Sequence, residues 1–481
     1  MTTIATSMTS KLDVQAGDLR FTFWESGDLY QAVSGRTMIN QLMTSPLDGS
    51  LNNLYLRIHG DSGIRSYPLL GVHSGSAVRA GEGRLVWEGA AESVAYRVTF
   101  APVKRGVWFW DVEARGDGME IDVIYGQDIG VADPGAVLNN EAYLSQYIDH
   151  AVFKDEAKGY VVCSRQNQPQ GGAFPYVQQG ALTGAAGFST DGFQFFGRSY
   201  KETNVPAALS EAKLANKIYQ YEFAYTALQS QPVALSGEAR FVFYGLFKPD
   251  HAAAVTELEY ADEVQAAWEA YLAAAGTAAP LRELPPVRLK PSIGEPLRAL
   301  SLKEEEVKAR FPRIRQEERD GQGRLLAFFT DTYELVVLKE KELLVERPHG
   351  HILMSGRSVK LGGDVLTTTS YMYGLFNSHV VVGNTNFNKL MSNARNPLNV
   401  PKTAGQRIYV GKRRQVPAAD DAVAVRARIQ LCAVVLQDGG RHADHYERHG
   451  GGFAGGAPAC ACGERQAVPL SGDESGHDAC Q

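Results

Sequence analysis

Cysteine is scarce and long apolar runs are absent over most of this 481-residue chain. Cys163 is the single cysteine before residue 411, and we expect it to be a small buried apolar side chain in a reduced cytoplasmic protein. No apolar run approaches the roughly 18 residues of a membrane-spanning helix. The segment Met1–Ser7 lacks the basic residues and apolar core of a secretory signal. We therefore expect a cytoplasmic protein with no membrane partner.

Excess basic charge and the common catalytic motifs are also lacking. The formal net charge is −6 at pH 7, which argues against nonspecific binding to nucleic acid or to anionic membranes. The chain has no Gly-x-Ser-x-Gly elbow, no Walker A loop, no dinucleotide fingerprint and no His-Glu-x-x-His zinc helix. These absences exclude the enzyme classes that depend on such motifs. The hydrophobic content of 44% is nevertheless that of a globular protein with a sizeable core.

Residues 15–250 are predicted to form one large antiparallel β-sandwich. Apolar residues alternate with polar or small ones over Val94–Phe100 and again over Trp108–Val112. An expected turn at Gly116–Gly118 leads to a third such segment, Met119–Tyr125. Period-two patterning between Gly- and Asp-containing turns is typical of antiparallel strands that bury one face. Few helical patterns intervene, which favours a mainly β sandwich over a parallel α/β sheet.

Residues 251–298 are predicted to form a helix and then a proline-rich linker. Asp250 is a suitable N-cap, and residues 252–275 contain neither proline nor glycine. The apolar residues that share one helical stripe are Val255, Leu258, Ala261, Val264, Trp268 and Leu272. Five prolines between Pro280 and Pro296 favour extended backbone and mark a domain boundary.

A second β-rich unit is predicted over residues 299–410. It begins with a charged segment at 301–310 that favours a helix. The strand patterns that follow lie at 325–329, 333–338, 343–347, 366–373 and 379–382.

The composition changes abruptly near Gly411. The last 70 residues contain four of the five cysteines but only two of the 46 aromatic residues, and they lack Asn, Trp and Met. A GC-rich gene read out of frame tends to yield this mixture of Ala, Gly, Arg, Pro, Cys and His. We interpret 411–481 as a low-complexity, disordered tail produced by a frame disruption. Translating the other two frames past the codon for Val410 tests this interpretation.

The tail contains the most suggestive metal-binding pattern in the chain. His442, His445 and His449 precede Cys460 and Cys462, and together they could supply four ligands to zinc. The flanking glycine runs, however, provide no strand or helix to hold such ligands in place. We therefore expect no metal site.

Acidic residues of the first unit have ordinary structural interpretations. Asp149 and His150 are adjacent, and consecutive residues of a strand face opposite sides. This favours a polar loop at a strand end over an acid–base pair. Asp128 and Asp133 lie near Gly126 and Gly130, and we expect them to form turns rather than to act in catalysis.

The segment from Tyr371 to Pro397 combines aromatic residues with many asparagines. Asn and His side chains donate and accept hydrogen bonds, and aromatic rings present flat apolar faces, the two kinds of surface that sugars need. In the alternative interpretation, the asparagines cap turns and the aromatic residues fill the core. Side-chain chemistry alone favours that alternative.

Three segments carry long and specific motifs: Asp128–His150, Val345–Leu353 (VERPHGHIL) and Asn377–Lys389 (NSHVVVGNTNFNK). In these motifs and in their order the chain resembles glycoside hydrolase family 94, the inverting glycoside phosphorylases. The resemblance covers roughly residues 18–410. It is strongest to the 1,2-β-oligoglucan phosphorylases, and cyclic β-1,2-glucan synthase and cellobiose phosphorylase are similar at a greater distance.

The resemblance implies an N-terminal β-sandwich, a helical linker, an (α/α)6 catalytic barrel and a small C-terminal β piece. The family's general acid is an aspartate of the barrel, and no series of paired helices with a central acid follows Val410. Inverting phosphorolysis needs that acid to protonate the leaving oxygen while phosphate attacks the opposite face of the sugar. We therefore expect no barrel here, assign no catalytic residue, and predict that this truncated chain is inactive on its own.

The resemblance also implies β-1,2-glucooligosaccharides as partners, inorganic phosphate as co-substrate of the full-length family, and no cofactor. The candidate substrate-binding residues, chosen by motif membership and side-chain chemistry, are Tyr147, His150, Asn377 and His379. Dimerisation of the family through its N-terminal region leaves a homodimer open. The alternative function is a non-catalytic carbohydrate-binding or scaffolding β-sandwich protein.

Overall fold

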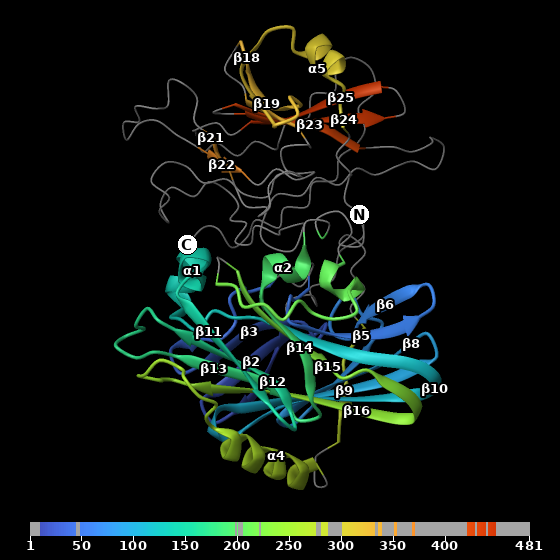
Figure 1. The fold of residues 1–481 in the computed structure, drawn as a ribbon, viewed down its shortest axis with the longest axis vertical. Helices are drawn as coiled ribbons and strands as arrows, with labels where there is room; N and C mark the ends of the chain where they lie inside the picture. Colours follow the sequence, from blue (N-terminus) through green and yellow to red (C-terminus); the bar gives the residue numbers. More distant parts are fainter. Residues whose placement is uncertain are drawn as a thin grey trace. The chain divides into compact units, whose positions relative to one another are not determined.

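The computed structural model describes residues 10–44, 49–197, 200, 205–220, 223–275, 280–286, 301–331, 335–338, 351–353, 368–370, 421–428, 431–438 and 441–448. The chain divides into a first unit, residues 1–200 with 205–293, and a second unit, residues 201–204 with 294–481. Each consists mainly of antiparallel strands (Figure 1). The mainly β class predicted from the sequence is confirmed. Among the described residues, no helix is long and apolar enough to cross a membrane.

A four-stranded antiparallel sheet begins the first unit. Its strands pair in chain order: β1 (Lys11–Ala16), β2 (Leu19–Trp24), β3 (Leu29–Ser34) and β4 (Thr37–Met38). Gly17 and Gly35 have φ values of +62° and +56° in the turns after β1 and β3. Tight hairpin turns need such backbone angles, which glycine adopts without steric cost.

A 13-stranded sheet makes up the rest of the first unit. Its strands are β5 (Asn53–Gly60), β6 (Gly63–Pro68), β7 (Ala77–Gly81), β8 (Arg84–Ala91), β9 (Val94–Val103), β10 (Val107–Asp128), β11 (Ile148–Asp155), β12 (Gly159–Gln166), β13 (Tyr176–Ala181), β14 (Ala185–Asp191), β15 (Ala224–Ser230), β16 (Val233–Lys248) and β17 (Arg282–Glu283). The main path is β15-β14-β12-β13-β16-β10-β9-β8-β7-β17, while β11 pairs with β12, and β5 pairs with β10 and β6. The short helices are η1 (Lys104–Gly106), α1 (Pro134–Ser145), α2 (Gly192–Phe196) and η2 (Ala207–Ser210).

Strand β10 is continuous where the sequence predicted a turn at Gly116–Gly118. It pairs with β16 on both sides of this point, and its register shifts between Asp117 and Met119. Gly118, with φ of +73°, is the unpaired extra residue of a β-bulge. The predicted turn is therefore wrong. The glycines bend one long strand, because β16 continues alongside and keeps both halves in the same sheet.

Aromatic side chains fill the core between the two sheets of the first unit. Trp87, Trp108 and Trp110 are each at most 1% exposed. Phe100 of β9 contacts Trp110, with ring centroids 4.4 Å apart, and Phe21 of β2 at 4.8 Å. The small sheet thereby packs on the large one. Cutting a buried aromatic side chain to alanine costs roughly 3–5 kcal/mol, so this cluster is a major source of the unit's stability.

Helix α4 (Ala261–Ala275) covers the other face of the large sheet (Figure 1). Val264 and Tyr271 are buried there, and the Tyr271 ring lies 5.6 Å from that of Phe109. The helix begins nine residues later than the expected start at Ala252, and Leu272 of the predicted stripe is 44% exposed.

Arg165 and Tyr260 hold non-helical backbone before α4. Its Nε donates to the carbonyl of His251 at 2.6 Å, and its Nη2 donates to that of Ala252 at 2.9 Å. These bonds tie the expected start of the helix to β12, and Tyr260, directly before Ala261, has a non-helical φ of +65°.

The second unit contains a helix and a six-stranded sheet. Their bounds are α5 (Glu304–Arg310), β18 (Ile314–Arg319), β19 (Leu325–Thr330), β20 (Leu335–Val337), β23 (Asp421–Arg428), β24 (Leu431–Asp438) and β25 (Arg441–Arg448), and the sheet follows this strand order. A separate pair is formed by β21 (His351–Leu353) and β22 (Thr368–Ser370). The predicted helix at 301–310 and the strand at 333–338 are present in shortened form, and the strand predicted at 325–329 extends one residue further as β19. The predicted strands at 343–347 and 379–382 lie outside the described residues.

Part of the tail that we expected to be disordered is in strands. β23 pairs with β20, and β24 and β25 extend the sheet from it. The run Leu431–Leu436 is rich in apolar and β-branched residues, which favour a strand even in a segment of unusual composition. The rest of the tail, residues 411–420, 429–430, 439–440 and 449–481, lies outside the described residues.

Candidate functional site

Tyr147 lies in the turn between α1 and β11. Its backbone N–H donates to the carbonyl of Leu144 at 3.1 Å, and its own carbonyl accepts from the backbone N–H of Asn167 at 2.9 Å. The residue is 38% exposed, although Ile148 beside it is fully buried. Both sides of the turn are thus fixed, and the ring is held at the surface of the first unit.

His150 lies two residues into β11 but inside the protein. It is 6% exposed, and its Nδ1 is 2.9 Å from Oγ of Ser164, its partner residue on β12. Burial lowers the pKa of His150 to about 4, so the ring is neutral at neutral pH. The structure therefore does not bring Tyr147 and His150 together at one surface. Asp149 and His150 are successive residues of a strand and face opposite sides of it.

Other residues singled out in the sequence have varied outcomes. Cys163 is a free thiol with 0% exposure, as expected of a small buried apolar side chain, and burial raises its pKa to about 12. Asp133 caps α1 by accepting from the N–H of Gly135 at 2.9 Å, in agreement with a local turn role.

Asp128 does not have the local turn role that we expected. Its Oδ2 accepts from the backbone N–H groups of Gln41 and Leu42 at 2.8 and 2.7 Å, and it is 2% exposed. It thus joins the end of β10 to a segment more than eighty residues away in sequence.

The remaining predicted site residues cannot be placed in this way. Asn377 and His379 lie outside the described residues. So do Cys460 and Cys462 of the proposed zinc pattern. Within the described part of the chain, no group of three or more His, Cys, Asp or Glu side chains is arranged to hold a metal ion.

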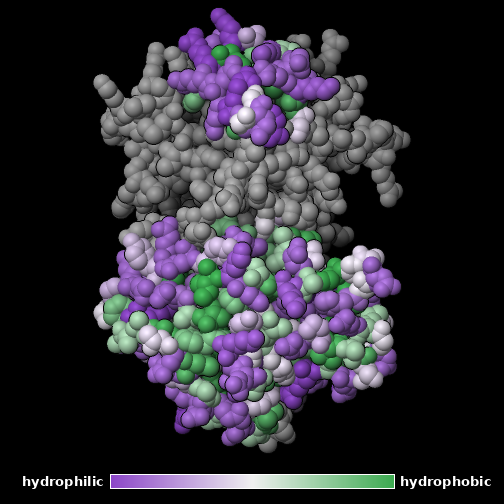
Figure 2. Space-filling model, viewed as in Figure 1, coloured by the Kyte–Doolittle hydropathy of each residue, from purple (hydrophilic) through white to green (hydrophobic). Residues whose placement is uncertain are grey.

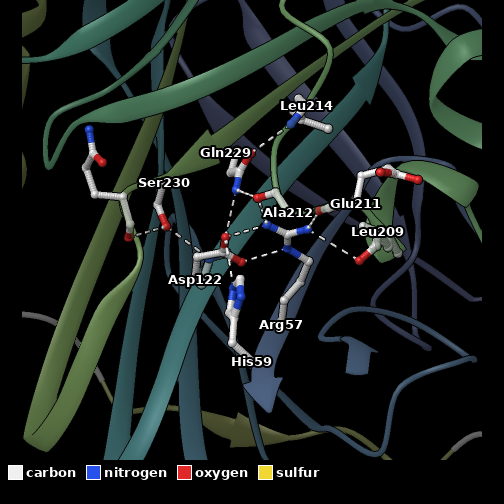
Figure 3. Close-up of polar contacts among 11 residues, drawn as sticks. Arg57, His59, Asp122, Leu209, Glu211, Ala212, Leu214, Gln229 and Ser230 are labelled. Atoms are coloured by element: carbon white, nitrogen blue, oxygen red, sulfur yellow. Dashed lines mark hydrogen bonds and ion pairs between the residues drawn. The ribbon is translucent and has the colours of Figure 1, made fainter. Parts of the chain in front are cut away.

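A buried ion pair anchors the long connection between α2 and β15 (Figure 3). Arg57 of β5 and Asp122 of β10 are both 0% exposed, and Nε and Nη2 of Arg57 donate to the two carboxylate oxygens at 2.7 and 2.5 Å. Nη1 of Arg57 then donates to the backbone carbonyls of Leu209 and Glu211 at 3.3 and 2.5 Å. One guanidinium group thus joins two sheet strands to η2 and to the residue that follows it.

Gln229 of β15 completes this anchor (Figure 3). Its Nε2 donates to Asp122 Oδ2 at 2.8 Å and to the carbonyl of Ala212 at 2.9 Å, and its Oε1 accepts from the backbone N–H of Leu214 at 3.0 Å. His59 adds a ring nitrogen 3.3 Å from the same carboxylate. Charged groups inside a protein are tolerated only when paired and hydrogen-bonded in this way.

We call residues 211–220 the anchored segment, and it leads to the turn that contains Tyr147. The side-chain Nε2 of Gln220 donates to the backbone carbonyl of Gln146 at 2.7 Å. Nearby, Oγ of Ser145 accepts from the N–H of Ala224 at 2.6 Å. Exposed amide side chains of Gln146, Gln220 and Asn167 therefore lie on the segments around Tyr147. We call these four residues the Tyr147 surface.

The Tyr147 surface combines an exposed aromatic residue with three exposed amide residues, of which Gln220 donates to the Gln146 carbonyl and Asn167 accepts from Nη1 of Arg165. Figure 2 shows apolar residues in patches among hydrophilic ones on one face of the first unit. Among the residues that the structure describes, Ile218 is the most exposed large apolar residue, at 50%, and it lies on the same segment as Gln220. Rings and amides together suit a ligand with apolar faces and many hydroxyl groups.

Sequence reasoning missed Arg57 and Asp122. The available signal was a charged residue in the middle of a strand with apolar residues on both sides, as in Leu-Arg-Ile at 56–58. Such a residue needs a buried partner of opposite charge. The partner, Asp122, lies 65 residues further along the chain, and only the pairing of the strands brings it beside Arg57.

Comparison with known proteins agrees with this architecture. The family described as "SOGP N-terminal domain" matches residues 22–245, and the family described as "Glycoside phosphorylase supersandwich domain" matches residues 311–416. These residues belong to the glycoside phosphorylase domain families. The chain is also 39% identical over 403 residues to a 1,2-beta-oligoglucan phosphorylase of Listeria innocua serovar 6a. The match covers 84% of this chain and 36% of that protein, so the chain spans about a third of the relative's length.

Among solved structures, a GalM/aldose epimerase homologue from C. elegans is similar over half of this chain. The match covers 50% of this chain and 99% of that structure, with 8% sequence identity and a TM-score of 0.26. A likeness this low carries no argument about the phosphorylase domains.

Proposed function

We propose that this chain is the carbohydrate-binding and structural N-terminal part of a glycoside phosphorylase that acts on β-1,2-linked glucooligosaccharides. The observation that carries the proposal is the 39% identity to a 1,2-beta-oligoglucan phosphorylase over 84% of the chain. The two matching phosphorylase domains, in consecutive order, support it.

The Tyr147 surface is the proposed place of sugar contact on the first unit. The ring of Tyr147 would cover the apolar face of a glucose residue, and the amides of Gln146, Gln220 and Asn167 would bind hydroxyl groups. The Arg57–Asp122 anchor would serve this surface by fixing the segment that carries Gln220. His150, buried beneath the start of β11, would support the strand that begins beside Tyr147.

The reaction assigned to the full-length family defines what this part would contribute. Phosphate attacks the anomeric carbon of a terminal glucose while a carboxylic acid protonates the leaving oxygen, which yields glucose 1-phosphate and a shortened glucan. Phosphate is itself a nucleophile, so the reaction needs one carboxyl group and no organic cofactor. We assign that acid to no residue of this chain, and propose binding without turnover.

The remaining parts of the proposal concern the cellular setting. A reduced cytoplasmic compartment is supported by Cys163, a free buried thiol. A homodimer remains part of the proposal, and sedimentation of the whole chain would measure it.

The direct test combines two assays on the same preparation. The whole chain is incubated with β-1,2-glucooligosaccharides and inorganic phosphate, and glucose 1-phosphate is measured. Binding of the same oligosaccharides is measured by isothermal titration calorimetry. We expect saturable heat and no protein-dependent glucose 1-phosphate. Release of glucose 1-phosphate would overturn the absence of turnover, and the lack of any binding would overturn the carbohydrate role.

A further inference from the structure

Arg165 holds the amide of Asn167 in one orientation on the Tyr147 surface. Nη1 of Arg165 donates to Asn167 Oδ1. The guanidinium is itself fixed, because its Nε and Nη2 donate to two backbone carbonyls beyond β16 at 2.6 and 2.9 Å, and it lies 4.3 Å from the ring centroid of Phe174. Arg165 is 6% exposed. A guanidinium has only donors, so the oxygen of the Asn167 amide must face it and the NH2 group faces away.

The amide of Gln220 is fixed in the opposite sense. Its Nε2 donates to the backbone carbonyl of Gln146 at 2.7 Å. A carbonyl oxygen only accepts, so the NH2 group of Gln220 faces the turn and Oε1 points away from it. Both Asn167 and Gln220 are exposed. Within the described part of the chain, neither Nδ2 of Asn167 nor Oε1 of Gln220 forms a further hydrogen bond.

The two amides are tied to consecutive residues of one turn. The backbone N–H of Asn167 donates to the carbonyl of Tyr147 at 2.9 Å, and Gln220 bonds the carbonyl of Gln146, the residue before it. A fixed donor and a fixed acceptor therefore belong to the same turn as an exposed aromatic residue. Because both amides are already oriented, a ligand need not order them, and this lowers the entropic cost of binding.

We propose that Asn167 and Gln220 determine which ligands the Tyr147 surface accepts. The proposal rests on the carbohydrate function proposed above for that surface. One ligand hydroxyl accepts from Asn167 Nδ2, and another donates to Gln220 Oε1. A hydroxyl can both donate and accept, whereas an ionised carboxylate or an ether oxygen only accepts. The surface thus selects neutral sugars with free hydroxyl groups. Arg165 is a positioning residue, because it acts on the ligand only through Asn167.

Asn167→Asp separates a ligand contact from a structural role. Aspartate keeps an oxygen that accepts from Arg165, but its second oxygen replaces the NH2 group. We expect the affinity for β-1,2-linked glucotriose to fall about fivefold or more, as for the loss of one hydrogen bond, without a loss of Tm. Asn167→Ala should weaken binding no more than Asn167→Asp does. If Asn167 serves only to bond Arg165, then Asn167→Asp binds like the unmodified chain, and the proposal is overturned.

Gln15→Glu is the matched control. It makes the same exchange of an NH2 group for an oxygen at an exposed glutamine of β1, whose Nε2 donates to the Gly17 carbonyl at 3.0 Å. It adds the same negative charge as Asn167→Asp, and it should leave the affinity unchanged. An equal loss of affinity in the two variants would attribute the effect to net charge and overturn the role of Asn167.

A measurement without ligand tests the two orientations directly. In the 15N-labelled whole chain, the NH2 signals of Asn167 and Gln220 are identified by their loss in Asn167→Asp and Gln220→Glu. We expect one NH2 hydrogen of Gln220 to exchange with solvent several-fold more slowly than those of Asn167, because it is bonded to the Gln146 carbonyl. Equal exchange at the two amides would overturn the assigned orientations.

The two proposals fail in different ways. If the unmodified chain gives no saturable heat with β-1,2-linked glucotriose, the carbohydrate function is wrong and the selectivity falls with it. If the unmodified chain binds and Asn167→Asp binds equally well, the carbohydrate function stands and only the roles of Asn167 and Gln220 are wrong.

Discussion

Removal of the Asp122 carboxylate should destabilise the first unit strongly. Asp122→Ala leaves the Arg57 guanidinium, which is 0% exposed, without its counter-charge. It also removes an acceptor 2.8 Å from Nε2 of Gln229. Breaking a buried ion pair on one side costs about 3–5 kcal/mol, because the remaining charge stays in a medium that solvates it poorly. We expect a loss of about that size in the free energy of unfolding, measured by urea denaturation followed by circular dichroism.

Two controls separate the buried charge from a general effect of losing an acid. The exposed pair Arg115–Glu238 has a similar N–O distance of 2.8 Å, but its side chains are 64% and 70% exposed. Glu238→Ala should therefore change stability little. The double variant Arg57→Met with Asp122→Leu should recover much of the loss, because no unpaired charge remains.

The same substitution should loosen the segment that Arg57 anchors. Lys213 and Lys217 are exposed residues of that segment, and trypsin should cleave after them faster in Asp122→Ala than in Glu238→Ala. The reasoning is refuted if Asp122→Ala lies within about 1 kcal/mol of the unmodified protein, well below the cost expected for a buried pair. It is also refuted if cleavage at these two lysines is unchanged.

Three further substitutions test other parts of the account. Burial raises the pKa of Asp128 to about 6 from 3.8, so its stabilising contribution is complete below the unfolded value and is lost as pH rises through 6. In Asp128→Asn, the free energy of unfolding should fall by about 2–3 kcal/mol less as pH rises from below 3.8 to above 6, measured by urea denaturation at each pH. The same dependence of the unfolding free energy on pH in both proteins would contradict this. Gly245→Ala places a methyl group 2.0 Å from the Trp108 ring, whereas nothing lies within 4 Å of Gly321. Calorimetry should show that Gly245→Ala lowers the free energy of unfolding by about 1–3 kcal/mol and that Gly321→Ala changes it little. Equal effects of the two substitutions would contradict a steric cost at Gly245. Tyr147→Ala should weaken oligosaccharide binding several-fold without lowering Tm, and unchanged affinity would remove Tyr147 from the proposal.

Alternation in the sequence predicted much of the fold but not where strands bend or helices begin. Trp108 and Trp110 alternate with residues of the opposite strand face, and this period-two pattern predicted that both tryptophans are buried. Gly116–Gly118 has the composition of a turn, and only the continuous antiparallel pairing with β16 makes it a bulge. Likewise, the residues after Ala252 have helix-forming composition, but Arg165 bonds two carbonyls there and Tyr260 has a positive φ directly before the helix, and neither contact is visible in the sequence.

The candidate site was harder to predict because motif membership does not show which way a side chain faces. Tyr147 and His150 lie three positions apart, yet one is 38% exposed and the other 6%. Strand β11 begins between them and turns His150 toward the core. The Arg57–Asp122 pair depends on the register of β5 against β10, and period-two patterning does not specify register between distant strands.

The proposed function requires that this chain binds β-1,2-linked glucans through the Tyr147 surface. Calorimetric titration of the whole chain with a β-1,2-linked glucotriose, beside its β-1,4-linked isomer, tests it most directly. Leu272→Ala serves as a control, because it removes an apolar side chain that is 44% exposed on α4, away from α1 (Figure 1). We predict saturable heat with the β-1,2 isomer that Tyr147→Ala weakens and Leu272→Ala does not. No heat with either isomer, or equal heat with both, would contradict the account.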